Sequence, residues 1–294
     1  METMTLPLVV GVDGSDGSLL AIDWATDEAT RTELPLRLVY ASLWERYEGA
    51  TPKLRRERAS EQVLADHIVA SAAERVLRNN PDLTVSTETV PAEAVTALLA
   101  EGRNATALIT GSRGRGELKG TLLGSVGLAV AARADCPVIV VRGDKAALTG
   151  SHERILLGAG EPDTCAEAVR FAFQEAETRG CELDVVRAWR CPAREAADET
   201  ALAEDPAHQH ATQASALVEK LVADAAAQHP GVRVRRTAVE GAARKVLVHR
   251  SAAADLVILG ARRRSGRFGL QLGRVGHTLL HHAECPVAVV PQTS

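Results

Sequence analysis

The sequence predicts an α/β protein of two tandem domains, each an open, doubly wound sheet of five parallel strands with helices on both faces. Three observations support this fold class. A chain of 294 residues is long enough for about two domains. Short β-branched runs alternate with helical stretches, which favours parallel strands joined by right-handed crossovers. The chain also repeats itself, so the elements of one half predict those of the other.

The N-terminal half opens with residues 8–12, a short apolar run typical of a buried parallel strand. Turn and capping residues follow it, and an alanine-rich helix is expected over 18–32. Residues 36–42 favour a second strand. The charged helix expected over 56–78 ends at the Asn-Asn dipeptide before Pro81, because the residue before a proline disfavours helical backbone.

The rest of this half continues the alternation. Residues 85–90 favour a third strand, and the helix expected over 92–102 ends at a glycine. A fourth strand over 105–110, a helix over 125–134 and a fifth strand over 138–141 complete the expected domain. The C-terminal half repeats the order, with strands expected near Ile155, Leu183, Val232, Leu256 and Val287.

The repeat is clearest near the end of each half, where ADCPVIVV at 134–141 returns as AECPVAVV at 283–290. Two upstream segments recur at nearly the same spacing: ALITG at 107–111 as LVILG at 256–260, and LVVGV at 8–12 as ILLGA at 155–159. The junction falls near residues 146–152. We therefore expect domains at 1–147 and 148–294.

Composition narrows the classes of protein. The hydrophobic fraction of 46% and the charged fraction of 24% are ordinary for a globular chain with a real core. A net charge of −4 gives no reason to expect nucleic acid or an anionic membrane as partner. No apolar run approaches the ~20 residues that cross a bilayer, and the N-terminus lacks a signal-type pattern. The expected location is cytoplasmic, with reduced thiols rather than a disulfide framework.

Ligands of such sheets bind beyond the carboxyl ends of the strands, where the strand order reverses. Glycines and arginines gather after the fourth strand, as Gly111-Ser112-Arg113-Gly114-Arg115-Gly116 and then Gly124-Ser125-Val126 at a helix start. Glycines let main-chain N–H groups approach an anion, and arginines add positive charge. No Walker-type phosphate loop is present, and the first turn lacks a dinucleotide fingerprint. Composition alone leaves open a phosphate site or a plain surface turn.

Three motifs together resemble those of the universal stress protein family. They are Gly111-x2-Gly114-x9-Gly124-Ser125, the segment Val10-Gly11-Val12-Asp13-Gly14-Ser15, and Cys136-Pro137-Val138 before the last strand. The resemblance covers the whole chain, as a tandem-domain member. It implies an ATP-binding protein of stress response or signalling, with ATP bound together with Mg.

The resemblance also implies roles for individual residues. Asp13 is similar to the acidic residue that accepts hydrogen bonds from the nucleoside, although helix N-capping is an alternative role for it. Val12 and Ala41 fall where the family lines its adenine slot. The residues implied at the phosphates are Gly111, Arg113, Gly114, Gly124, Ser125 and Val126.

The C-terminal half departs from these motifs. Arg263 takes the place of the second glycine, Gly273-Arg274 replaces Gly124-Ser125, and Gly160 stands where Asp13 stands. Ordinary ATP binding is therefore not expected there. Several arginines cluster in its loop, either as a site for another anion or as a solvated basic surface: Arg262, Arg263, Arg264, Arg267 and Arg274.

Other candidate sites are weaker. His277 and His281 have the spacing of two residues that share a metal ion, but no third ligand is evident. His208 and His210 are equally weak candidates for metal ligands. No nucleophile–base set is evident, so a catalytic function is not the first hypothesis. The alternatives to regulatory ATP binding are a slow ATP-hydrolysing or phosphoryl-transfer enzyme, using Arg113 or Arg115, and a nucleotide-free scaffold.

The resemblance further implies how the halves associate. Single-domain relatives pair through their last strands, so residues 138–141 and 287–290 are expected to form an intramolecular pseudo-dimer. A homodimer of such chains is left open.

Overall fold

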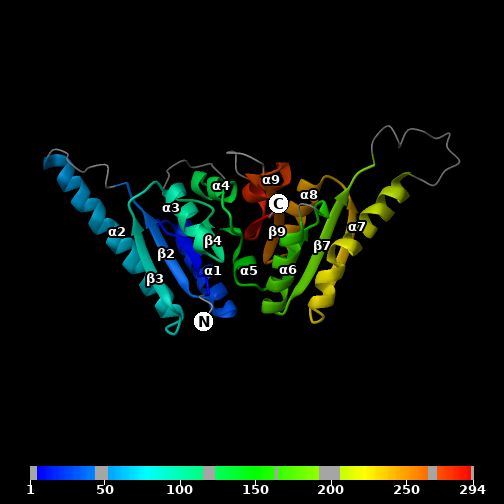
Figure 1. Ribbon diagram of the computed structural model, residues 1–294, viewed down its shortest axis with the longest axis horizontal. Helices are drawn as coiled ribbons and strands as arrows, with labels where there is room; N and C mark the ends of the chain where they lie inside the picture. The colour runs from blue at the N-terminus through cyan, green and yellow to red at the C-terminus, as the bar shows by residue number, and fades with distance from the viewer. Residues whose placement is uncertain are drawn as a thin grey trace. The chain divides into compact units, whose positions relative to one another are not determined.

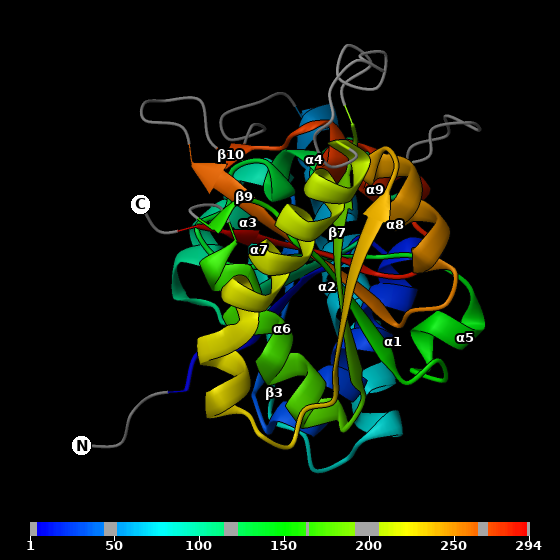
Figure 2. The same ribbon diagram turned by 90° about the vertical axis from the view of Figure 1, so that its right-hand side faces the viewer.

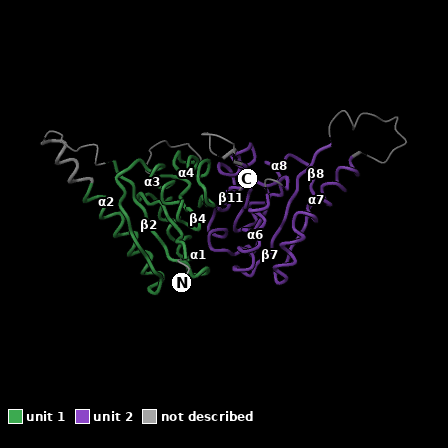
Figure 3. Tube along the Cα trace, in the orientation of Figure 1, with its two compact units in different colours: residues 1–142, 265–270 green, residues 143–264, 271–294 purple. Residues whose placement is uncertain are grey.

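The computed structural model describes six stretches of the chain: residues 5–43, 52–114, 123–162, 165–191, 206–263 and 270–292. The chain forms two compact units, which comprise residues 1–142 with 265–270 and residues 143–264 with 271–294 (Figure 3). Each unit contains a parallel sheet with helices on both faces (Figure 1). The α/β fold class expected from the sequence is confirmed.

The first unit follows the expected alternation of strand and helix. Its strands lie in the order β3-β2-β1-β4-β5, and every pair is parallel. In chain order its elements are β1 (Leu8–Gly11), α1 (Asp16–Thr32), β2 (Leu36–Ala41), α2 (Pro52–Asn79), β3 (Val85–Val90), α3 (Ala94–Glu101), the 3-10 helix η2 (Gly102–Asn104), β4 (Ala107–Gly111), α4 (Ser125–Ala131) and β5 (Val138–Val141).

Two helices cover each face of this sheet. Helix α1 contacts α2 on one face, and α3 contacts α4 on the other. Strand β1 lies between β2 and β4, so that Leu8 is paired with both Leu36 and Ala107. All four residues of β5 are buried, as expected for a strand covered on both sides. Aliphatic packing on both faces therefore holds the carboxyl ends of β1, β2 and β4 together.

The second unit repeats this arrangement. Its strands lie in the order β11-β9-β6-β7-β8, again with every pair parallel. Helices α6 and α7 contact each other on one face, as Figure 2 shows, and α8 contacts α9 on the other. Its elements are α5 (Lys145–Leu148), β6 (Arg154–Gly158), α6 (Ala166–Arg179), β7 (Glu182–Trp189), α7 (Pro206–Gln228), β8 (Val234–Glu240), α8 (Ala243–Ser251), β9 (Leu256–Arg263), β10 (Leu270–Gln271), α9 (Arg274–His282) and β11 (Val287–Pro291).

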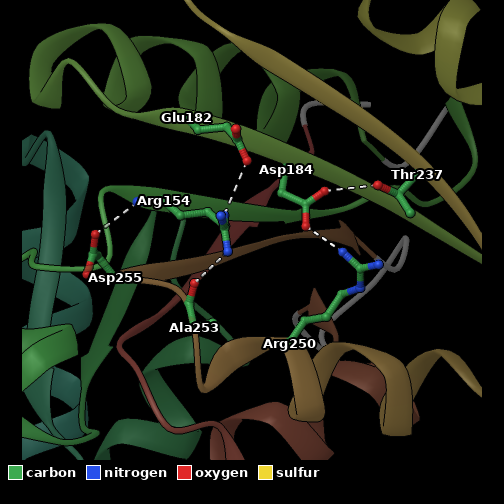
Figure 4. A network of polar contacts seen from close by, with 7 residues as sticks. All are labelled: Arg154, Glu182, Asp184, Thr237, Arg250, Ala253 and Asp255. Atoms are coloured by element: carbon green, nitrogen blue, oxygen red, sulfur yellow. Dashed lines mark hydrogen bonds and ion pairs between the residues drawn. The ribbon is translucent and has the colours of Figure 1, made fainter.

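Polar contacts inside the second unit fix its strands and helix α8 (Figure 4). The carboxylate of Asp184 is buried and accepts hydrogen bonds from Thr237 at 3.1 Å and from Arg250 at 2.6 Å. Asp255 is also buried and accepts from the main-chain N–H groups of His152 and Arg154, each at 3.0 Å. These bonds satisfy two carboxylates that would otherwise be costly to bury.

The strands β3 and β8 lie at the ends of their units' strand orders and carry polar side chains. In β3 the exposed residues are Ser86, Thr87 and Glu88. In β8 they include Arg235 and Arg236. Among the helices of the described residues, none combines the length and the apolar character needed to span a bilayer.

Candidate functional site

The acidic residue after β1 is held in place by its neighbour. Oδ1 of Asp13 accepts from the main-chain N–H of Ser15 at 2.9 Å and from its hydroxyl at 2.5 Å. Ser15 is itself the N-cap of α1, because its Oγ accepts from the N–H of Ser18. The alternative role of Asp13 as a helix N-cap is therefore wrong. Asp13 is half-buried just after β1, and its carboxylate is fixed by these two bonds to the N-cap residue of α1.

The glycine-containing loop after β4 packs against this turn. A Cβ atom at Gly114 would lie 2.6 Å from Oδ2 of Asp13, and one at Gly111 would lie 2.4 Å from the carbonyl carbon of Gly17. A side chain at Gly111 would clash with backbone, and one at Gly114 would force the Asp13 carboxylate to move. The hydroxyl of Ser15 also donates to the carbonyl of Arg113 at 3.3 Å. The two segments, about a hundred residues apart in sequence, are thus in direct contact.

The start of α4 closes back onto the same loop. The N–H of Gly124 donates to the carbonyl of Ser112 at 2.7 Å, and Ser112 in turn donates to Val141 at 3.0 Å. Ser125 is exposed and Val126 is half-buried in the first turn of α4. These contacts bring Gly111, Gly114 and Gly124 of the predicted motif together at one end of the sheet.

The remaining predicted positions lie on the neighbouring strands. Val12 is buried, and its N–H donates to the carbonyl of Val39 in β2 at 2.9 Å. Ala41 ends β2 two residues further on and is half-buried. Arg113 is exposed at the rim. Arg115 and Gly116 lie outside the described residues.

The sequence predicted turn and capping residues after the first strand, but not which bonds they form. The hydroxyls of Ser15 and Ser18 organise the turn after β1. Oγ of Ser18 accepts from the N–H of Gly14 at 3.1 Å and donates to the carbonyl of Ser15 at 3.0 Å. An Asp-x-Ser spacing directly before a helix is the signal that predicts this turn.

The second unit contains a cavity at the equivalent end of its sheet. Its volume is about 330 Å³, and it opens beyond the carboxyl ends of β6, β7 and β9 beside the start of α9. The register of β6 against β7 and β9 matches that of β1 against β2 and β4. The cavity was not predicted from the sequence, because the recognition residues of the first half are replaced there.

The charged and thiol groups of this cavity differ from those of the first half. Arg187 donates to the carbonyl of Ala159 at 3.2 Å and forms an ion pair with Glu161. Cys165 stands where Ser18 stands in the first half, and its buried Sγ lies 3.8 Å from the carbonyl oxygen of Gly158. Burial raises the pKa of the Cys165 thiol, so it is protonated and unreactive at neutral pH.

The arginine and histidine candidates are partly described. Arg262 and Arg274 are exposed, whereas Arg264 and Arg267 lie outside the described residues, as does the side chain of Arg263. The rings of His277 and His281 lie 4.6 Å apart on α9. The ring of His210 stacks on that of Trp189, with the ring centroids 6.4 Å apart. Within the described ranges, no three His, Cys, Asp or Glu side chains are grouped so that they could hold a metal ion.

A family model matches both halves of the chain, over residues 4–142 and 152–291, and its description is "Universal stress protein family". The chain belongs to the universal stress protein family. Its two matches make it a tandem-domain member, as the sequence motifs implied. Both matched ranges contain the sheet end at which the site or the cavity lies.

Curated relatives match this chain over nearly its whole length. Universal stress protein Rv2623 of Mycobacterium tuberculosis is 30% identical, over 98% of this chain and 97% of the relative. Universal stress protein Rv2005c of the same organism is 32% identical, over 97% of each. A solved universal stress protein from Archaeoglobus fulgidus has a TM-score of 0.70 at 16% identity, covering 99% of this chain and 100% of that one. The last comparison supports the fold.

Proposed function

We propose that the N-terminal half of this universal stress protein binds ATP, together with Mg²⁺, as a regulatory ligand in stress response or signalling. The observation that carries the proposal is the close approach of Asp13 to Gly114, where an added Cβ would lie 2.6 Å from Oδ2 of the carboxylate. It sets an acceptor carboxylate beside a main-chain loop at the switch point of a doubly wound sheet, where ligands of such folds bind.

Each part of the nucleotide has a matching part of the site. The buried Val12 and the half-buried Ala41 supply an apolar wall for the base. Oδ2 of Asp13 faces the loop and is suited to accept from a ribose hydroxyl. The main chain of residues 111–114 and the start of α4 supply N–H groups for the phosphates, with Ser125 and Val126 at the rim.

The charges of the site fit a nucleotide that carries a cation. Asp13 repels a bare triphosphate at short range, so positive charge is needed between the carboxylate and the phosphates. Arg113 is exposed at the loop and supplies one such charge, and Mg²⁺ on the phosphates supplies the other. We therefore expect binding of the Mg²⁺ complex to be tighter than binding of free ATP.

Recognition rather than turnover is supported by the way Asp13 is bound. Ser15 donates two hydrogen bonds to Oδ1, which fix the orientation of the carboxylate as an acceptor beside Gly114. ATP binding would then order the loop and change the surface that the protein offers to a partner. The competing function, slow ATP hydrolysis, predicts continuous phosphate release.

The test is calorimetric titration of nucleotide-stripped protein with ATP and Mg²⁺. We expect ATP to bind in the first half without steady-state phosphate release. Gly114→Asp should abolish ATP binding, because it displaces Asp13 and adds a like charge. The matched control is Gly231→Asp, because a Cβ at Gly231 meets no atom within 4 Å. No ATP binding by the wild type would refute the proposal, and sustained phosphate release would replace it with the enzyme alternative.

A further inference from the structure

The cavity of the second unit carries an inference that goes beyond ATP binding. We propose that it binds a neutral, flat, bicyclic aromatic compound and discriminates against nucleoside triphosphates. The second half would then hold a second ligand of different charge, rather than a lost copy of the ATP site. The size, lining and charge of the cavity support such a ligand.

The size of the cavity suits a small ring system. A volume of about 330 Å³ lies within the range of small-molecule pockets in proteins, near its lower end. Small residues at the strand ends make this space, including Gly158, Ala159 and Gly160 on β6 and the loop after it. A Cβ at Gly273, beside α9, meets no atom within 4 Å, so the cavity stays open on that side.

Apolar side chains form most of the wall. The apolar lining includes Val186 and Ala188 of β7, Leu259 of β9, Val289 of β11 and Leu247 of α8. A flat ring that enters between such walls removes apolar surface from water on both of its faces. Main-chain groups supply polar contacts. Helix α9 begins at Arg274, its N-cap Gly273 makes no side-chain cap bond, and Gly273, Val275 and Gly276 line the cavity.

The charges at the cavity favour a neutral ligand. Among the described residues that line it, the charged side chains are Arg187 and Glu161, and they pair with each other. Arg187 is further held by the carbonyl of Ala159. A ligand with several negative charges would be repelled by Glu161 and would have to compete with it for Arg187, which is costly.

The first half has different residues at the positions that determine the charge of the ligand. Asp13 is replaced by Gly160, which removes the acceptor carboxylate, and Gly114 is replaced by Arg263. Ser18 is replaced by Cys165, which removes a hydroxyl and leaves a protonated thiol at the cavity. The replacements of Asp13 and Ser18 remove two polar recognition groups, while the slot between the strand ends remains.

Reciprocal variants test the inference. Val39 and Val186 occupy equivalent registers, so Ala41 and Ala188 are equivalent positions on β2 and β7. Ala188→Trp fills the cavity of the second half, and Ala41→Trp fills the proposed adenine slot of the first. Binding of two neutral probes, adenosine and indole, is followed by saturation-transfer NMR at up to about 1 mM, and ATP with Mg²⁺ is titrated separately.

We expect at least one probe to bind the Ala41→Trp protein and to lose affinity by more than about tenfold when Ala188→Trp is added. Adenosine alone would identify a nucleoside-type ligand, and indole, with or without adenosine, a more general aromatic one. The inference would be overturned if neither probe bound, or if neither variant weakened the binding of a probe. It would also be overturned if ATP displaced the probe from the Ala41→Trp protein. Failure of ATP to bind the wild type would refute only the proposed function of the first half.

Discussion

Ser15 donates both its main-chain N–H and its hydroxyl to Oδ1 of Asp13, at 2.9 and 2.5 Å. The same hydroxyl oxygen accepts from Ser18 and caps α1. One serine therefore sets both the start of the helix and the direction of the carboxylate. Local stability and the proposed ligand affinity are coupled through this residue.

Replacement of this serine is expected to affect both properties. Ser15→Ala removes the cap and one bond to Asp13, and we expect a loss of about 1 kcal/mol of unfolding free energy. We also expect ATP affinity to fall by about tenfold. Ser15→Thr keeps the hydroxyl and is the control. Chemical denaturation and calorimetry measure the two effects, and an Ala variant that binds ATP as the wild type does would separate Asp13 from recognition.

Two glycines of the same motif are expected to differ in their tolerance of a side chain. A Cβ at Gly114 would lie 2.6 Å from Oδ2 of Asp13, whereas the nearest atom to a Cβ at Gly124 would lie at 3.6 Å. Gly114→Ala should therefore displace Asp13 and weaken ATP binding by about tenfold or more. Gly124→Ala should bind nearly as the wild type does. Equal affinities of the two variants in a titration would contradict the geometry.

The ion pair between Asp184 and Arg250 is expected to stabilise the second unit. Arg250→Ala leaves the buried carboxylate with Thr237 as its remaining partner shown in Figure 4, and we expect a loss of about 2–3 kcal/mol. The matched control is Arg78→Ala, which breaks an exposed pair with Glu74 and should cost less than about 0.5 kcal/mol. If the two variants lost similar amounts of unfolding free energy in urea denaturation, burial would add nothing to the strength of the Asp184–Arg250 ion pair.

A buried thiol should make stability fall at alkaline pH. Burial raises the pKa of Cys136 from its ordinary 9.0 to about 11. Below pH 9 the thiol is protonated in both folded and unfolded chains, so its contribution is fully present. Between pH 9 and 11 the unfolded chain loses the proton first, and up to about 2–3 kcal/mol is lost.

The comparison for this prediction is Cys136→Ala, which lacks the titrating group. Its unfolding free energy should fall less steeply between pH 9 and 11 than that of the wild type. Burial also raises the pKa of Cys165 and of Cys181, so part of the decline remains in the variant. Parallel curves for the two proteins would rule out a contribution from Cys136.

Strand positions could largely be predicted from the sequence, because a buried parallel strand needs a continuous apolar run. The predicted strand at 138–141 matches the buried β5 residue for residue. The strand predicted at 85–90 also matches β3, although β3 is an outer strand with exposed polar residues and no continuous apolar run. Strand β4 runs from Ala107 to Gly111 instead of over 105–110. The difference arises at the strand ends, where the apolar pattern fades.

Helix ends were less predictable, since they depend on which side chain caps. Helix α1 begins at Asp16 rather than residue 18, because Ser15 is its cap. Helix α3 begins at Ala94 rather than residue 92, because the carboxylate of Glu93 accepts from the N–H of Thr96. The short α5 in the expected junction was missed, although Asp144 caps it in the usual way.

The candidate site was predictable where function depends on residue type and less so where it depends on shape. The glycine motif and the aspartate after the first strand were sufficient to predict that Asp13 and Gly114 belong to one site. The cavity of the second half depends on small residues spread over β6, β7 and β9, which no local motif marks. Sequence reasoning therefore identified what the second half lacks and missed the space that remains.

The polar rims of the two sheets have a consequence for behaviour at high concentration. An unpaired outer strand offers its main chain to any other extended chain, which is how ordered aggregates begin. Strand β3 carries Thr87 and Glu88 outward, and β8 carries Arg235 and Arg236. A foreign strand that approaches either rim must bury charge against an apolar segment. The charged side chains of the two outer strands should therefore disfavour edge-to-edge association when the protein is concentrated.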